Sequence, residues 1–307
     1  MKQILPFLLF FLPMLVQAQS ASDYHTQGIE AYEKGKHEEA MELFSKALEI
    51  KNDDAVIYYD RGIIHLNLEK FEEGIQDFKQ ALEYSDDVEL SKQALLNIAF
   101  VQRNVTQDLK NAMDNVNYIL QIDSSYSRAH YLRGLILYDM RKLEEAISNF
   151  DRAIELDPTN PDPYYDRGLS KRKLDRIQGA IQDYSKAIEL DPLYSRAYNN
   201  RGFARLKIED YEGAKKDFGA AIRINNDAYS YNNRGFAKYK LGDYKSAKMD
   251  CEKSIELDPN NSWAYHYLGL IEYELGDTEK ACKLFKKAFS MGKLDAKADI
   301  EEKCQTN

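Results

Sequence analysis

The chain of 307 residues contains few of the side chains from which most active sites are built. It has five histidines and three cysteines, and no pair of them has the spacing of a metal site. A glycine-rich phosphate-binding loop and a Gly-x-Ser-x-Gly nucleophile motif are both missing from the sequence. We therefore predict a protein that is not an enzyme and that holds neither a metal ion nor a cofactor.

Long hydrophobic runs are also missing after the N-terminus. Residues 4–16 are mostly apolar, follow Lys2 and lead to Val16-Gln17-Ala18, which is typical of a secretory signal peptide over 1–18. An uncleaved anchor is the alternative, although the run is shorter than the roughly 20 residues that span a bilayer. We expect an exported chain, cleaved near Ala18, that is periplasmic or extracellular, soluble and without a transmembrane segment.

Positive charge is in the minority. The 42 Lys and Arg residues stand against 51 Asp and Glu residues, which gives a formal net charge of −9. Because nucleic acid binding depends on neutralising phosphates with cations, we expect no nucleic acid partner.

What the sequence does contain is a unit of about 34 residues that repeats. The regular spacing is clearest for seven glycines, at intervals of 34, 72, 34, 34, 33 and 34 residues: Gly28, Gly62, Gly134, Gly168, Gly202, Gly235 and Gly269. Most units also have an alanine twelve residues after the glycine and an aromatic residue four residues later. Each unit has the periodicity of two helices joined by a short turn. The pattern predicts a solenoid of stacked helix pairs.

This pattern resembles the tetratricopeptide repeat family, as in the segments YYDRGLSKRKLDRIQGAIQDYSKAIELDP and YNNRGFAKYKLGDYKSAKMDCEKSIELDPNN. The resemblance covers nearly the whole chain after the signal peptide. It implies an all-α, right-handed superhelical solenoid in which the first helix of each pair lines a concave groove. It also implies a scaffold or adaptor that binds a protein or peptide.

The repeat register divides the chain into about eight units and a cap. The solenoid covers 19–291, and the third unit is degenerate, with Ala99 in place of the glycine. Residues 292–307 are expected to form a capping helix and tail, since a terminal repeat needs a polar cover. The expected repeats are 21–54, 55–88, 92–126, 127–160, 161–194, 195–227, 228–261 and 262–291.

The ligand-binding modes of the resembled family are matched only in part. Of the positions that clamp a C-terminal carboxylate in that family, only Asn200 fits. A second mode grips a peptide backbone with a ladder of asparagines, and Asn200 and Asn233 occupy the ladder position. Asparagines, aromatic residues and cations together suit peptide contacts. The predicted partner-binding groove comprises Arg196, Asn199, Asn200, Phe203, Lys207, Tyr229, Asn232, Asn233, Phe236 and Lys240.

Two sets of cations have open interpretations. An arginine precedes five of the repeat glycines and either lines the groove or pairs with acidic neighbours such as Asp60 or Asp166. The first helices of repeats five to seven also contain a basic cluster, which either complements helix dipoles or makes the groove suited to an acidic peptide segment. The cluster comprises Lys171, Arg172, Lys173, Arg196, Arg205, Lys207, Lys238 and Lys240.

The three cysteines are all near the C-terminus. Cys251 replaces the aromatic residue of its repeat and is expected to pack as a small hydrophobe. Cys282 and Cys304 lie about equally far from the turn that precedes the capping helix, so an antiparallel pair of helices brings them to a similar height. We predict a Cys282–Cys304 disulfide, with two free thiols as the alternative.

The function expected from these observations is a non-catalytic protein–protein interaction scaffold or adaptor that binds a partner peptide or helix in its concave groove. Two alternatives are a cell-envelope assembly or secretion factor and a module that binds a glycan or another ligand. The sequence indicates neither the partner nor the oligomeric state.

Overall fold

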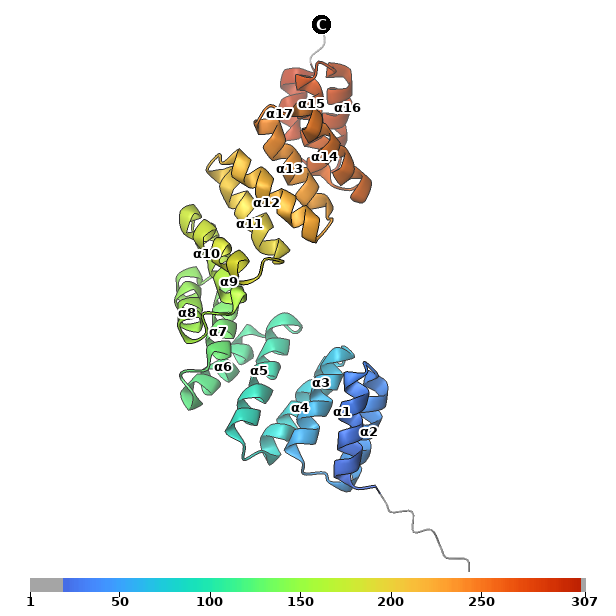
Figure 1. The fold of residues 1–307 in the computed structure, drawn as a ribbon, viewed down its shortest axis with the longest axis vertical. Helices are drawn as coiled ribbons and strands as arrows, with labels where there is room; N and C mark the ends of the chain where they lie inside the picture. Colours follow the sequence, from blue (N-terminus) through green and yellow to red (C-terminus); the bar gives the residue numbers. More distant parts are fainter. Residues whose placement is uncertain (1–18, 305–307) are drawn as a thin grey trace, which may run out of the picture. The chain divides into compact units, whose positions relative to one another are not determined.

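The structure is a computed structural model that describes residues 19–304, so the predicted signal peptide lies outside the described residues. Within 19–304 the chain forms seventeen α-helices and no β-strand, which confirms the predicted all-α fold of helix pairs. The chain divides into two compact units, 1–119 and 120–307 (Figure 1).

Unit 1 consists of consecutive antiparallel helix pairs. Over α1 to α5, the first helix of each pair packs along the second, and the second packs on the first helix of the next pair. Its helices are α1 (Ala21–Glu33), α2 (His37–Ile50), α3 (Ala55–Asn67), α4 (Phe71–Tyr84), α5 (Val88–Asn104) and most of α6 (Leu109–Ile122).

Unit 2 continues the same plan with five pairs and a short final helix. Its helices are α7 (Ser127–Asp139), α8 (Leu143–Leu156), α9 (Pro161–Lys173), α10 (Ile177–Leu190), α11 (Ser195–Lys207), α12 (Tyr211–Ile224), α13 (Ala228–Lys240), α14 (Tyr244–Leu257), α15 (Ser262–Glu274), α16 (Thr278–Ser290) and α17 (Ala296–Lys303).

The repeat glycines allow the two helices of a pair to approach closely. A Cβ atom added at Gly62 would lie 2.8 Å from Cε1 of Phe78, and one added at Gly202 would lie 2.8 Å from Cε1 of Phe218. The aromatic ring therefore occupies the space that a larger residue would need. In the α13–α14 pair Cys251 takes the place of the ring, with its sulphur 2.8 Å from the same position at Gly235.

The turn between the helices of a pair requires one residue with positive φ. Gly35, Gly242 and Gly276 supply it at three turns, and the residue is not glycine at five others. Glu209, for example, has a φ of 59°. The α5–α6 turn places Gln107 in this conformation. α5 itself begins at Val88, earlier than the expected start at 92, because the Asp87 carboxylate accepts from the N–H groups of the first turn.

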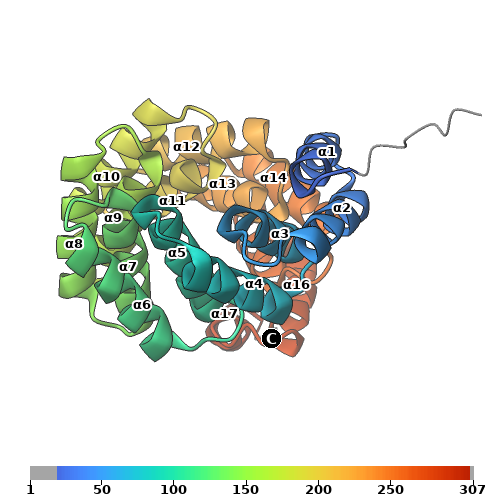
Figure 2. The same ribbon diagram turned by 90° about the horizontal axis from the view of Figure 1, so that it is seen from below.

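In unit 2 the first helices of successive pairs also touch one another. α9 contacts α7 and α11, while α13 contacts α11 and α15. Figure 2 shows α7, α9 and α11 on the inner side of the curve within this unit, with α8, α10 and α12 outside them. We call the surface formed by α7, α9, α11, α13 and α15 the inner surface of unit 2.

Candidate functional site

The predicted groove residues lie on α11 and α13, two neighbouring helices of the inner surface. Arg196, Asn200, Phe203 and Lys207 have the spacing i, i+4, i+7 and i+11, so they follow one face of α11. Tyr229, Asn233, Phe236 and Lys240 repeat this spacing on α13, and Asn199 and Asn232 each precede the asparagine of the row.

The accessible part of this set is smaller than the sequence predicts. Arg196, Lys207 and Lys240 are exposed, Phe203 is 41% exposed and Tyr229 is 62% exposed. In contrast, Asn232 and Asn233 are only 3% and 7% exposed. A peptide in contact with α11 and α13 would therefore meet the exposed side chains and Asn200, with little access to the asparagines of α13.

Side chains at the ladder position mainly form hydrogen bonds between successive repeats. Nδ2 of Asn200 donates to the Tyr165 hydroxyl at 3.1 Å and to the Arg196 carbonyl at 2.9 Å. Because both amide hydrogens are used, only the Oδ1 atom of Asn200 is left to accept a hydrogen bond from a ligand. Hydrogen bonds at the equivalent positions of other repeats connect Tyr131 with Asp166, His25 with Asp60, and Tyr59 with Asn97.

The partners in these hydrogen bonds were missed in the sequence. They are mostly aromatic residues three positions before the repeat glycine, and their regular recurrence was the available signal. Burial, followed by the charge of Asp166, raises the pKa of Tyr131 far above its usual range, so its hydroxyl stays a donor. The position therefore has a structural role in unit 1 and at the start of unit 2.

In α11 and α13 asparagine replaces the aromatic residue of this register. Oδ1 of Asn199 accepts from the Ser230 hydroxyl at 2.9 Å, and Asn232 Nδ2 donates to Oδ1 of Asn233 at 3.2 Å. Oδ1 of Asn232 is buried and has no hydrogen-bond partner among the residues that the structure describes. Asn232 and Asn233 are thus buried polar groups of α13, and only the half-buried Asn199 of α11 bonds across to α13.

Arg196 is held between aromatic rings. Its guanidinium carbon lies 5.3 Å from the ring centre of Tyr165 and 5.3 Å from that of Tyr194. The Tyr194 hydroxyl accepts from Arg196 at 3.2 Å and donates to Asp162 at 2.7 Å. Stacking fixes the planar guanidinium while leaving part of it accessible, which is a good arrangement for binding a carboxylate or a peptide carbonyl.

Aromatic side chains extend this surface toward the C-terminus. Phe203 makes an edge contact with Phe218, and Phe236 stacks on Tyr267 with ring centres 4.5 Å apart. Trp263 occupies in α15 the register position of Arg196 and Tyr229, and it is 44% exposed. The Lys293 ammonium lies 3.4 Å from the centre of the Trp263 ring. Exposed aromatic area is therefore available on three successive inner helices.

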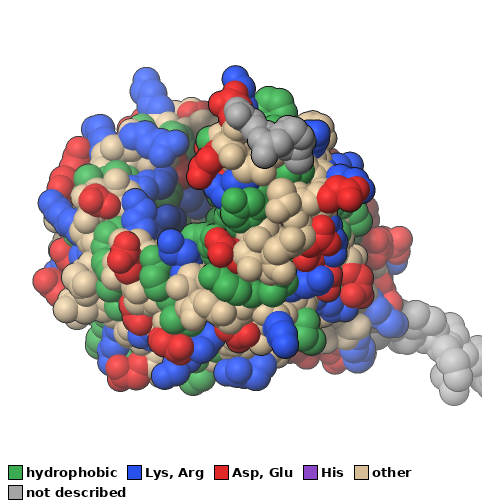
Figure 3. All heavy atoms as spheres, turned by 90° about the horizontal axis from the view of Figure 1, so that it is seen from above, with side chains coloured by type: hydrophobic (Ala, Val, Ile, Leu, Met, Phe, Trp, Pro, Cys, Tyr) green, Lys and Arg blue, Asp and Glu red, His purple; other side chains and the backbone are tan. Residues whose placement is uncertain are grey.

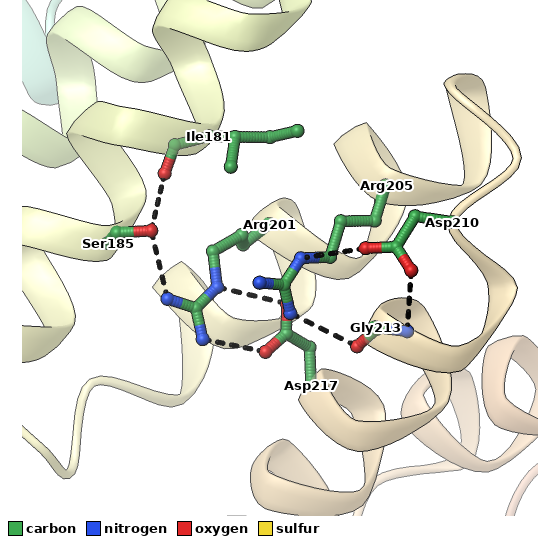
Figure 4. Close-up of polar contacts among 7 residues, drawn as sticks. All are labelled: Ile181, Ser185, Arg201, Arg205, Asp210, Gly213 and Asp217. Atoms are coloured by element: carbon green, nitrogen blue, oxygen red, sulfur yellow. Dashed lines mark hydrogen bonds and ion pairs between the residues drawn. The ribbon is translucent and has the colours of Figure 1, made fainter.

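The arginine before the repeat glycine pairs with an aspartate of the second helix. Arg201 of α11 makes a two-pronged interaction with Asp217 of α12 at 3.0 and 2.7 Å, and it also reaches Ser185 of α10 at 3.0 Å (Figure 4). Because one guanidinium contacts its own repeat and the previous one, it holds neighbouring units in register. Equivalent pairs are Arg61–Asp77, Arg167–Asp183 and Arg234–Asp250.

These contacts confirm ion pairing for four of the five arginines, with partners other than the predicted ones. Asp60 and Asp166 accept instead from His25 and Tyr131, on the first helix of the preceding repeat. The carboxylates that pair with the arginines lie sixteen residues further on, across the helix pair. Acids adjacent in the sequence were predicted as partners, whereas the helix-turn-helix geometry brings aspartates sixteen residues away close to the arginines.

A second cation, four residues after the arginine, shares the same carboxylate. Arg205 contacts Asp217 at 2.8 Å, while Lys171 and Lys238 make equivalent contacts with Asp183 and Asp250 (Figure 4). Three members of the predicted basic cluster are therefore part of structural ion pairs.

Two other exposed cations of the cluster also have neighbouring side chains within the protein. Lys207 lies 3.7 Å from Asp175, and the ammonium of Lys173 lies over the Tyr138 ring. Figure 3 shows Lys and Arg side chains interspersed with acidic and hydrophobic ones on the face that it displays. Arg196 is the cation of this cluster that is best placed to meet a ligand at the inner surface.

A disulfide and a polar contact attach the C-terminal helix to the last repeat. The structure joins Cys282 of α16 to Cys304 by a disulfide with Cα atoms 5.6 Å apart, while Cys251 is a free, buried thiol whose pKa is raised by burial. His266 of α15 lies 2.7 Å from Asp299 of α17. This contact uses the same register as the inter-repeat hydrogen bonds, so α17 takes the place of the next first helix.

Residues 19–304 contain neither a cluster of metal ligands nor a helix suited to cross a membrane. No group of three His, Cys, Asp or Glu side chains is arranged to hold a metal ion in this range. Over the same residues, none of the helices combines the length and the apolar character needed to cross a membrane.

The helix pairs, their glycine–aromatic contacts and their arginine–aspartate links define a helical repeat scaffold. Models of the tetratricopeptide repeat match 55–87, 127–160, 149–182, 195–227, 228–261 and 251–283, and a model of the TPR repeat matches 28–69 and 168–209. Together these matches cover 28–87 and 127–283. The chain belongs to the tetratricopeptide repeat family, whose members are scaffolds for protein interaction.

Solved structures show the same fold. The chain is similar to PilF of Pseudomonas aeruginosa, with a TM-score of 0.62 and 18% identity over 70% of this chain and 99% of that one. Yeast Tom70 matches with a TM-score of 0.55 and 20% identity over 95% of this chain and 65% of that one. MamA of Desulfovibrio magneticus RS-1 matches with a TM-score of 0.52 and 21% identity over 54% and 95%. No curated protein matches the chain.

Proposed function

We propose that the protein is an interaction scaffold that binds an extended segment of a partner protein on the inner surface of unit 2. The observation that carries this proposal is the exposed row Arg196, Phe203 and Lys207 along one face of α11, next to Tyr229 on α13. Aromatic and arginine side chains dominate the binding energy of protein interfaces, because they bury much area and make directional contacts.

The chemistry of the row suits a peptide backbone with an acidic side chain. Arg196 presents a guanidinium already oriented by Tyr165 and Tyr194, and Asn200 presents a free acceptor oxygen for a peptide N–H. The preorganised cation loses little side-chain freedom on binding a carboxylate. An acidic residue of the partner is therefore proposed to lie at Arg196, with apolar residues on Phe203 and Tyr229.

Site-specific photo-crosslinking tests the location. A photoreactive phenylalanine analogue at Phe203 or Tyr229 is expected to crosslink one reproducible partner protein from the native cells. The same analogue at Met249, which is 69% exposed on α14, serves as the matched control. A partner captured equally from Met249, or from none of the three positions, contradicts the assignment to the inner surface.

Once the partner segment is known, its affinity tests the individual residues. Arg196→Gln and Phe203→Ala should each weaken binding by about 1–2 kcal/mol. Asn233→Ala should change it less than Asn200→Ala, since Asn233 is buried. Loss of affinity on raising the salt concentration is expected for the wild type and should be smaller for Arg196→Gln.

We also propose that the chain acts outside the cytoplasm. α1 is capped by a reciprocal Ser20–Asp23 interaction, so the described fold begins two residues after the expected cleavage site at Ala18. The Cys282–Cys304 disulfide is compatible with an oxidising compartment. N-terminal sequencing and non-reducing peptide mass spectrometry of protein from its native compartment test both points. An intact Met1, or both thiols free, contradicts the proposal.

A further inference from the structure

The α11–α12 pair departs from five of the other pairs at positions that lie outside the predicted groove. In five other second helices the tenth residue is long and polar and the thirteenth is glutamate. These residue pairs are Lys46/Glu49, Gln80/Glu83, Arg152/Glu155, Lys186/Glu189 and Lys253/Glu256. In α12 the equivalent residues are Ala220 and Arg223. The change removes a long side chain and reverses a charge in the same turn.

The linker before α11 differs at the same place. Its Leu193 is 73% exposed. The equivalent residue of four other linkers is polar: Asp53, Ser125, Thr159 and Asn260. Because the leucine side chain stays exposed, it contributes little to folding stability. The other linkers named above have a polar residue at this position.

A hollow of about 460 Å³ lies beside these residues at the edge of the helix pair. It lies between the linker, the start of α11 and the end of α12, and is lined by Pro192, Leu193, Tyr198, Ala220, Arg223 and Ile224. In the α3–α4 pair the equivalent space is filled, since Tyr84 at the position of Ile224 stacks on Tyr58 with ring centres 5.8 Å apart. The corresponding ring in the α11–α12 pair, Tyr198, is half-buried and lines the hollow together with Ala220 and Ile224.

The hollow offers polar groups as well as apolar area. The hydroxyl groups of Tyr58 and Tyr164 donate to linker carbonyls at 3.2 and 3.3 Å. Tyr198 has the same register but makes no such hydrogen bond among residues 19–304. Arg223 is exposed and, within the same range, forms no ion pair with a carboxylate. In the equivalent pairs the cation and the glutamate satisfy each other, for example Lys186 and Glu189 at 2.7 Å.

We infer that this hollow is a second interaction surface, which binds a partner segment that presents an apolar side chain next to a carboxylate. The apolar side chain contacts Leu193, Ala220 and Ile224 above the Tyr198 ring. The carboxylate pairs with Arg223, whose charge is opposite to that of the glutamates in the other repeats. Charge complementarity thus selects an acidic, apolar segment, and the surface is separate from the Arg196 row.

The test restores the pattern of the other repeats. The double variant Ala220→Lys with Arg223→Glu copies Lys186 and Glu189. The first substitution fills the hollow, and the second gives the position the negative charge that it has in the other repeats named above. The variant should therefore fold like the wild type. Leu193→Asn, which copies Asn260, removes the exposed leucine separately. The matched control is Lys253→Gln with Glu256→Gln on α14. Thermal melting followed by circular dichroism checks that all variants fold.

The probe is a library of random peptides displayed on phage, selected on the Arg196→Gln/Phe203→Ala variant, in which Pro192, Leu193, Tyr198, Ala220, Arg223 and Ile224 are unchanged. We expect enriched peptides with Asp or Glu beside Leu, Ile or Phe. Their affinity should fall about tenfold or more in the Ala220→Lys/Arg223→Glu variant and in Leu193→Asn, but not in the α14 control.

Two outcomes overturn the inference. In one, the enriched peptides bind the wild type and the double variant equally, or have no acidic residue. In the other, sedimentation shows concentration-dependent association of the wild type that the double variant abolishes, so that a second copy of the chain occupies the hollow.

Discussion

At the scale of the residue, the buried aspartate of the second helix pairs with two cations of the first helix. Asp217 is almost fully buried and receives both Arg201 and Arg205. Removing one partner of a buried ion pair leaves the other charge without compensation. Asp217→Asn should therefore lower the free energy of unfolding by about 3–5 kcal/mol. Urea unfolding followed by circular dichroism measures it, with the exposed Glu212→Gln as the control that should change little.

The α7–α8 pair contains this substitution naturally. Arg133 donates to Asn149, which stands where four other pairs have aspartate, and burial lowers the pKa of Arg133. We expect Asn149→Asp to stabilise the protein, by about 1 kcal/mol, since it provides a charged acceptor. A destabilisation by Asn149→Asp, or an Asp217→Asn variant as stable as the wild type, would show that the links contribute no net stability.

At the scale of the element, the turns between paired helices are not uniformly optimised. Glu209 adopts a φ of 59°, a conformation that costs a non-glycine residue about 1–2 kcal/mol. Gly242 occupies the equivalent turn of the next pair. Glu209→Gly should raise the free energy of unfolding by about 0.5–1 kcal/mol after the extra freedom of the unfolded chain is counted. Gly242→Ala, measured in the same urea titration, should have the opposite sign; equal signs would contradict the explanation.

The capping helix gives a prediction about pH. Burial acts to raise the pKa of Asp299, but hydrogen bonds from His266 and Lys303 outweigh it and hold the pKa below its usual value. A carboxyl with a lowered pKa in the folded state stabilises above its unfolded value and loses this contribution as the pH falls through the folded pKa. At pH 7 Asp299→Asn should therefore cost about 1.5–3 kcal/mol.

The difference between wild type and Asp299→Asn should shrink below about pH 4, where the carboxyl of the unfolded chain is protonated. Chemical unfolding of both proteins between pH 7 and pH 3 measures it. Glu301→Gln is the control at an exposed carboxylate on the same helix. A difference that stays constant over the whole range would mean that Asp299 contributes through packing alone.

At the scale of the whole molecule, the repeat plan was predictable because the same constraint recurs in every unit. Gly202 lies opposite Phe218, and the equivalent close approach recurs along the chain, so the period of 34 residues indicates the helix pairs directly. The family resemblance and the matches to known repeats agree with it.

The candidate site was less predictable, because exposure depends on the neighbouring repeats. The spacing correctly indicates that Asn200 and Asn233 occupy equivalent positions, yet Asn200 bonds to Tyr165 of the previous pair while Asn233 is buried beside Asn232. Likewise, Arg205 looks like a free cation in the sequence but pairs with an aspartate twelve residues away. Single-helix patterns do not contain this information, since the contacts cross between helices.

The division of the chain into two units predicts that they unfold separately. Neighbour contacts dominate the stability of a repeat protein, so a destabilised repeat affects its own unit most. Trp263, the only tryptophan, lies in unit 2 and reports on that unit alone, whereas circular dichroism reports on both. Gly62→Ala places a Cβ 2.8 Å from Phe78 in unit 1, and Gly202→Ala places one 2.8 Å from Phe218 in unit 2.

In urea, Gly62→Ala should move the early part of the circular dichroism transition to lower denaturant while the Trp263 fluorescence midpoint stays nearly unchanged. Gly202→Ala should move the fluorescence midpoint by an amount that corresponds to about 1–3 kcal/mol. The two substitutions create the same contact distance, so a difference in response comes from the unit and not from the severity of the clash. If fluorescence and circular dichroism coincide in both variants, the two units unfold as one cooperative structure.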